Sequence, residues 1–127
     1  MIVVDTSVLV DALTGRRRSG PALRQAIGNG ERLVVPSLVL YEWLRGPREP
    51  AELAAQEAVF PKEAALPFGP PEAVVAARLY REVRGARARA ADLAIAACAL
   101  THSAPIWTLN PDDFRDIPGL DLFEGPA

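Results

Sequence analysis

The stretch MIVVDTSVLVD, residues 1–11, decides the fold of this chain. Residues 2–4 form a continuous apolar, β-branched run, which is typical of a strand buried on both faces of a sheet. The run ends at a carboxylate, Asp5, and two hydroxyl residues, Thr6 and Ser7, follow at once. The most buried strand is therefore expected to carry a charged side chain at its end, and the rest of the sequence has to explain that charge.

Composition limits the possible classes of protein. The 127 residues are half apolar with a formal net charge of −2, which indicates one soluble globular domain over residues 1–127. The apolar run at residues 93–100 is too short to cross a bilayer, and Asp5 interrupts what would be the apolar part of a secretory leader. Cys98 is the only cysteine, which excludes a disulfide framework and a multi-cysteine zinc site. We expect a cytoplasmic protein without a membrane segment.

Short apolar strands alternate with helical segments along the chain. We expect strands at residues 2–5, 33–35 and 106–109, an edge strand at 121–123, and helices at 6–13, 21–27, 37–46, 51–60, 71–84 and 90–102. This alternation predicts an α/β fold in which helices cover both faces of a parallel sheet. In such sheets, ligands bind beyond the carboxyl ends of the strands, which is where Asp5 is expected.

Three other segments place acids at comparable positions. Glu42 is the one acid in the apolar helical stretch PSLVLYEWLRG. Asp92 opens the apolar helix DLAIAACAL, while Asp112 and Asp113 follow the strand PIWTLN. Each has an ordinary structural explanation alone: a solvent-facing or dipole-complementing glutamate in the first turn of its helix, a helix N-cap, and a turn. Together with Asp5, however, one acid from each segment is expected at the same rim of the sheet.

Such a group of carboxylates needs a counter-charge. Ionised carboxylates in a partly dry pocket repel one another, and each loses hydration unless a partner neutralises it. The single lysine is Lys62, and the single histidine, His102, is at the far end of its helix from Asp92. Ligands that are all oxygen suit Mg²⁺ or Mn²⁺ rather than zinc. Acids that hold such a cation indicate phosphoryl chemistry, in which the metal polarises a phosphate and lowers the pKa of water.

Arginines near these acids are candidate contacts for substrate phosphates. Thirteen of the 14 basic residues are arginine, and a guanidinium binds phosphate oxygens in a bidentate manner. The candidates are Arg16, Arg17 and Arg18, which follow the first predicted helix, and Arg87 and Arg89, which precede Asp92. Arg78 and Arg81 are expected on a solvated helix face instead.

The segments MIVVDTSVLVD, SLVLYEWLRG, AADLAIAACAL and PIWTLNPDDF resemble, in order and spacing, the four acidic blocks of the PIN-domain ribonucleases, and most closely the VapC-type toxins of toxin–antitoxin pairs. The resemblance spans nearly the whole chain. It implies a three-layer α/β/α sandwich around a mainly parallel sheet and cleavage of RNA with Mg²⁺ or Mn²⁺. It also implies a homodimer and an antitoxin whose tail blocks the site.

The resemblance carries residue roles as well. The metal-site and catalytic acids that it implies are Asp5, Glu42, Asp92 and Asp113. Asp113 matches the fourth position better than Asp112 because it lies in an N-x-x-D-F setting that begins at Asn110. Supporting polar residues beside the acids are Thr6, Ser7, Thr108 and Asn110.

Other readings remain open from the residues alone. A housekeeping RNA-processing nuclease would have the same acids, and a non-catalytic PIN-like module would have no need of them. A phosphoacceptor signalling domain needs an aspartate after a central strand and normally a lysine near the last strand. Here the second strand ends in Val35, Pro36 and Ser37, and the strand at 106–109 has no lysine. We also expect Cys98 to behave as a small apolar residue.

Overall fold

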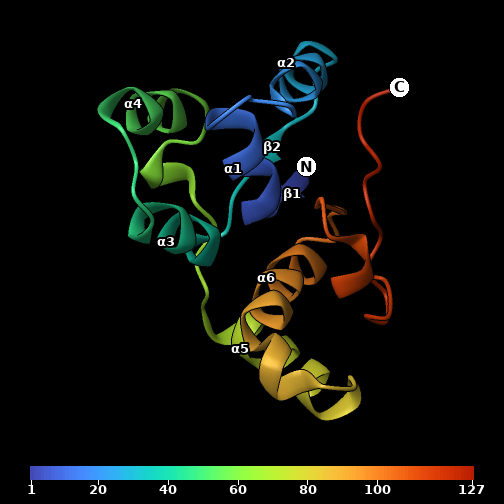
Figure 1. Cartoon of the computed structure of the whole chain (residues 1–127). Helices are drawn as coiled ribbons and strands as arrows, with labels where there is room; N and C mark the ends of the chain where they lie inside the picture. Colours follow the sequence, from blue (N-terminus) through green and yellow to red (C-terminus); the bar gives the residue numbers. More distant parts are fainter.

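The computed structural model describes residues 1–127 (Figure 1). Its sheet has three parallel strands in the order β2-β1-β3. The strands are β1 (Ile2–Val4), β2 (Leu33–Val34) and β3 (Ile106–Trp107). All three residues of the central strand β1 are buried, as expected for a strand with neighbours on both sides and helices on both faces. Because the strands are parallel, their carboxyl ends share one edge of the sheet.

Six α-helices and three 3₁₀ turns surround the sheet. The helices are α1 (Thr6–Leu13), α2 (Gly20–Gly28), α3 (Ser37–Arg45), α4 (Pro50–Val59), α5 (Pro70–Glu82) and α6 (Ala90–Thr101). The 3₁₀ turns are η1 (Lys62–Ala64), η2 (Ala86–Arg89) and η3 (Pro111–Asp113). Helix α1 packs against α2, α3 and α4, whereas α6 packs against α5 and β1 and also contacts α3. In Figure 1, α1 to α4 accordingly form one group and α5 and α6 the other, which confirms the predicted α/β fold.

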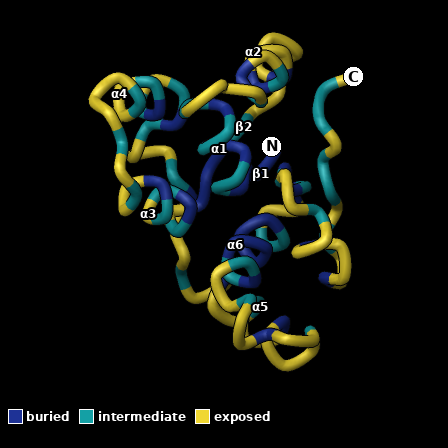
Figure 2. Tube along the Cα trace, viewed as in Figure 1, coloured by how far each residue is buried: buried dark blue, intermediate teal, exposed yellow.

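The core lies between these two groups of helices. Figure 2 shows the buried trace concentrated in β1, α1 and α6. Helix α6 is apolar nearly all round, and six of its residues, including Cys98, are buried, as its composition predicts. Trp43 and Trp107 are also buried, at 0% and 5% exposure, so neither indole is available on the surface. Arg78 and Arg81 are exposed, as predicted.

Proline and glutamate define the starts of α4 and α5. Each helix has proline in its first turn, where the missing N–H costs no hydrogen bond. The side chain of Glu52 accepts a hydrogen bond from the Glu49 N–H at 2.8 Å, and Glu72 accepts one from the Gly69 N–H at 3.0 Å. These contacts satisfy backbone donors that the helix itself leaves free. None of the helices combines the length and the apolar composition needed to cross a membrane.

The structure corrects several local predictions. The strand expected at 121–123 is only an isolated bridge between Leu122 and Ile106, because β3 offers just two residues before the chain turns towards the acids. Asp92 is the third residue of α6 and not its N-cap, which is Arg89. Glu42 lies in the second turn of α3, not the first.

Candidate functional site

Asp5 lies between the end of β1 and the start of α1, and it is only 5% exposed. Ser7 Oγ and Thr108 Oγ1 both donate hydrogen bonds to Asp5 Oδ2, at 2.9 and 2.7 Å. The N–H of Leu109 donates to Ser7 Oγ, and that of Asn110 donates to Thr108 Oγ1, both at 3.0 Å. Two backbone amides and two hydroxyls are thus aligned towards one carboxylate oxygen. Asp5 Oδ1 has no such partner, so this oxygen remains available to a ligand.

Glu42 is held by a different hydroxyl. Helix α3 packs against α1, and Thr6 Oγ1 donates to Glu42 Oε1 at 2.6 Å. The nearest cation is Arg45, whose Nη2 lies 3.7 Å from Glu42 Oε2 and whose side chain is 59% exposed. An exposed pair at that distance neutralises a carboxylate weakly. The adjacent residues Thr6 and Ser7 therefore serve two different acids.

Asp92 shows that the acids share one electrostatic environment. Burial, and then the charges of Asp5, Asp113 and Glu42 in that order, together raise the pKa of Asp92 to about 6. Arg89 lowers this pKa, but it is the weakest of these influences. Since like charges act on a carboxyl at short range, Asp5 after β1 and the acids of α3, α6 and η3 lie close enough to repel. The charges of Asp5, Asp113 and Glu42 thus all act on Asp92, so the four predicted acids lie near one another.

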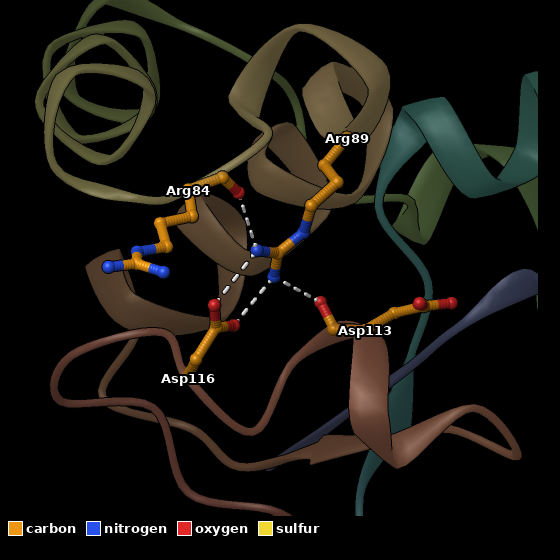
Figure 3. Close-up of polar contacts among 4 residues, drawn as sticks. All are labelled: Arg84, Arg89, Asp113 and Asp116. Atoms are coloured by element: carbon orange, nitrogen blue, oxygen red, sulfur yellow. Dashed lines mark hydrogen bonds and ion pairs between the residues drawn. The ribbon is translucent and has the colours of Figure 1, made fainter.

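Asp113 is positioned through its backbone. Arg89 Nη2 donates to the carbonyl oxygen of Asp113 at 2.7 Å, while Nη1 donates to that of Arg84 at 3.1 Å. Arg89 also binds Asp116 in a bidentate manner, with N–O distances of 2.7 and 2.9 Å. Figure 3 shows Arg89 in the middle of these partners and the Asp113 carboxylate directed away from it. The arginine thus ties η3 to the start of α6 while leaving the Asp113 carboxylate free.

The same ion pair changes the titration of both its members. The hydrogen bond to Asp116 raises the pKa of Arg89, and the hydrogen bond from Arg89 lowers the pKa of Asp116. Asp112 is paired with Arg115, and its side chain is 87% exposed. Of the two neighbouring acids, Asp113 is therefore the one whose charge is free to act on Asp92, which favours it over Asp112 as the fourth acid.

The predicted arginine contacts divide into two groups. The guanidinium of Arg89 donates to Asp116 and to the backbone of Asp113, so it is already bound within the protein. The others, Arg16, Arg17, Arg18 and Arg87, are exposed and form no ion pair. Asp116 was not predicted as a site residue. No local signal marks it, because it is 27 positions from Arg89 and lies in an ordinary acidic turn.

The donor set of the four acids suits the predicted cation in its chemistry. Its side chains supply only oxygen atoms, which is the chemistry that Mg²⁺ and Mn²⁺ prefer. Neither the Asp92 carboxylate nor Asp5 Oδ1 is taken up by a hydrogen bond from another side chain. However, no three His, Cys, Asp or Glu side chains are grouped closely enough to hold a metal ion together. The ligand atoms are thus of the type that the cation prefers, but the carboxylates would have to move closer together to bind it.

Comparison with known proteins identifies the family of this chain. The model of the PIN domain family matches residues 2–120. A ribonuclease named VapC19 from Mycobacterium tuberculosis is 34% identical over 122 residues, which cover 94% of this chain and 97% of that protein. Ribonuclease VapC from Rickettsia bellii is 31% identical, with 98% of this chain and 96% of that protein covered.

Solved structures show the same fold. The crystal structure of DNA-bound VapBC from Salmonella typhimurium aligns with a TM-score of 0.76 and 21% identity, covering 96% of each chain. VapBC2 from Rickettsia felis, bound to a promoter DNA fragment, aligns with a TM-score of 0.74 and 20% identity, covering 97% of this chain and 98% of that one. Since the family model covers nearly the whole sequence and two named ribonucleases are more than 30% identical to it, this chain belongs to the PIN domain family.

Proposed function

We propose that the chain is an endoribonuclease that hydrolyses RNA phosphodiester bonds with Mg²⁺ or Mn²⁺ and acts as the toxin of a toxin–antitoxin pair. The observation that carries the proposal is the environment of Asp92, whose pKa is raised to about 6 by burial and by three further carboxylates. Perturbed acids gathered from separate elements are typical of catalytic sites. The relatives named as VapC ribonucleases supply the class of substrate.

The four acids, Asp5, Glu42, Asp92 and Asp113, would hold the cation. A divalent cation offsets repulsion among carboxylates, polarises the scissile phosphate and activates water. The hydroxyls of Ser7 and Thr108 fix the Asp5 carboxylate, and that of Thr6 fixes Glu42, so both acids are oriented before substrate arrives. Asp92 must lose its proton to bind a cation. Because the pKa of Asp92 is raised to about 6, metal affinity should increase with pH through this value and level off above it.

The direct test is cleavage of a fluorescent single-stranded RNA by the wild type, by Asp5→Ala and by Asp121→Asn. Asp121 is an exposed acid outside the group that acts on Asp92, so its variant is a matched control. We expect cleavage by wild type and Asp121→Asn with Mg²⁺ or Mn²⁺, and none after chelation or in Asp5→Ala. Undiminished cleavage by Asp5→Ala would refute the site, and undiminished cleavage in a chelator would refute the metal.

The antitoxin partner is a separate part of the proposal. Its support is the fold, because solved neighbours include VapBC complexes and a toxin–antitoxin complex from Klebsiella pneumoniae. We expect expression of the chain alone to arrest growth and co-expression with the product of a neighbouring reading frame to restore it. Normal growth at a verified level of active protein would favour a housekeeping nuclease instead.

A homodimer in the cytoplasm completes the proposal. Three large side chains are partly exposed near one another on an apolar surface over α3, α5 and α6: Tyr41 at 57%, Phe68 at 45% and Tyr80 at 48%. Exposed apolar patches mark association surfaces. Light scattering on the purified chain is expected to give twice the monomer mass, and Phe68→Glu is expected to shift it towards the monomer. A monomer for the wild type would contradict the dimer.

A phosphoacceptor function has no support in the structure. The one cation that acts on Asp92 is Arg89, and the single lysine, Lys62, lies in η1.

A further inference from the structure

A surface groove of about 730 Å³ runs along helix α1, beside the acids. Thr6, Ser7 and Asn110 line it, and these residues also orient or flank Asp5 and Glu42. Arg16 and Arg18, in the loop after α1, line it as well. The eight residues of α1 span about 12 Å at 1.5 Å per residue. The groove therefore leads from the acids to two arginines one helix length away.

The two arginines that line this groove have no partner within the protein. Arg16 and Arg18 are exposed and form neither an ion pair nor a hydrogen bond through their side chains. Outside the groove lining, Arg89 and Arg115 are each paired with an aspartate, whereas Arg87 in η2 is exposed and unpaired. The groove itself thus carries uncommitted positive charge close to the acids, and this charge is suited to an anionic ligand.

The remaining lining residues also suit a nucleotide chain. Leu109 is 45% exposed and offers an apolar surface to a ribose or base. The Asn110 side chain forms no hydrogen bond within the protein, so its amide can donate and accept towards a ligand. Asp11 is the one acid in the lining, and it accepts a hydrogen bond from Ser19 Oγ at 2.5 Å. Two cationic side chains thus face one anionic side chain.

We propose that this groove binds the backbone of single-stranded RNA on one side of the scissile phosphate, with Arg16 and Arg18 contacting its phosphates. The inference rests on the proposed nuclease function and adds a direction to it: the strand leaves the acids along α1 and not past Arg89. Guanidinium groups bind phosphate oxygens through charge-assisted hydrogen bonds. Asp11 weakens this attraction, so it limits affinity at the same groove.

Arg17 provides a matched control. The sequence grouped it with Arg16 and Arg18 as a candidate phosphate contact, and it is exposed like them, but unlike them it does not line the groove. Replacing any one of the three arginines by alanine removes the same charge from the same loop. A difference among the three variants therefore reports contact within the groove rather than the overall charge of the protein.

The test is fluorescence anisotropy of a short labelled single-stranded RNA with the full chain in a chelator, measured over a range of salt concentrations. Arg16→Ala and Arg18→Ala are expected to weaken binding several-fold and each to lower the slope of log K against log salt by roughly 0.7. Arg17→Ala is expected to stay close to wild type, and Asp11→Asn to bind more tightly. Equal losses in all three arginine variants, or no loss in any, would overturn the proposal.

Two further readouts complete the test. If poly-glutamate displaced the RNA at equal charge concentration, the assignment of the groove to RNA would be wrong. Cleavage by the same variants with Mg²⁺ separates the two proposals. If Arg16→Ala and Arg18→Ala cleave RNA as fast as wild type, the groove proposal alone is refuted. If wild type does not cleave RNA, the nuclease proposal is refuted, and the binding measurements still test the groove.

Discussion

Asp5 and Asp113 follow neighbouring parallel strands, yet the protein holds them in opposite ways. Asp5 is buried, and two hydroxyls bind its carboxylate directly. Asp113 is exposed in a 3₁₀ turn, and Arg89 holds its backbone while leaving its carboxylate free. The Asp5 carboxylate is thus fixed by two hydroxyl donors, whereas Asp113 is held by one arginine that is distant in sequence. The Asp5 side should tolerate loss of one support, whereas the Asp113 side depends on one arginine.

The largest expected effect comes from removing either carboxylate. Asp5→Asn and Asp113→Asn should each lower the cleavage rate by about a hundredfold or more, because loss of one charge-stabilising group in an active site has this scale. Asp112→Asn is the matched control, since Asp112 is paired with Arg115. Single-turnover cleavage measures all three. A loss in Asp112→Asn as large as that in Asp113→Asn would reverse the assignment of the fourth acid.

The clamp on Asp113 gives the next effect. Arg89→Met should lower cleavage by roughly tenfold and loosen η3, because the charge-assisted bonds to Asp116 and Asp113 are each worth about 1–3 kcal/mol at most. Arg89→Lys should restore little, since lysine lacks the bidentate fork. Hydrogen exchange at η3 and RNA cleavage measure both. If η3 exchanged as in wild type while cleavage fell, Arg89 would act on substrate and not through Asp113.

The Asp92 environment predicts a pH dependence of stability without metal. The pKa of Asp92 in the folded protein is about 6, above its unfolded value near 3.9. The folded state therefore binds the proton of Asp92 more tightly, and the free energy of unfolding decreases as pH rises from about 4 to about 6. Asp92→Asn should remove this fall, and added Mg²⁺ should oppose it. Thermal denaturation across this range measures the effect. A wild-type curve parallel to that of Asp92→Asn would show that Asp92 is not perturbed.

At lower pH, the free energy of unfolding is expected to change with pH in the opposite direction. Arg89 lowers the pKa of Asp116, so the Arg89–Asp116 pair stabilises the fold above the unfolded pKa of Asp116, near 3.9. This stabilisation is lost as pH falls through the pKa of Asp116 in the folded protein. Asp116→Asn should remove this second component without changing the fall between pH 4 and 6. The two acids thus act in separate pH ranges, one for each side of the site.

The smallest effect tests the shared support of Asp5. Ser7→Ala should lower the free energy of unfolding by about 1.5–3 kcal/mol, because one hydroxyl donor to the Asp5 carboxylate is lost while Thr108 still donates. Ser7→Ala combined with Thr108→Val should cost more than the sum of the single changes, since the second loss leaves the carboxylate without a donor. Chemical denaturation of the three variants checks this. Additive losses would show that the two hydroxyls act independently.

The sequence by itself determined the α/β class, the positions of the helices and the four acids that the structure brings near one another. These follow from signals within a few residues: the apolar run before Asp5, the prolines that start α4 and α5, and the apolar composition of α6. The resemblance to PIN-domain ribonucleases rests on the same local blocks. The catalytic and metal roles of the acids stay predictions that the experiments above test.

Tertiary structure alone decided how the acids are held and which arginines are free. Thr6 turns to Glu42 while Ser7 turns to Asp5, although both are hydroxyl residues beside the same acid. Arg89, which the sequence grouped with the substrate contacts, is bound to Asp116, 27 positions away. Such pairings depend on how helices pack across the sheet, and a side chain's partner 27 or more residues away leaves no trace in local hydrophobic periodicity.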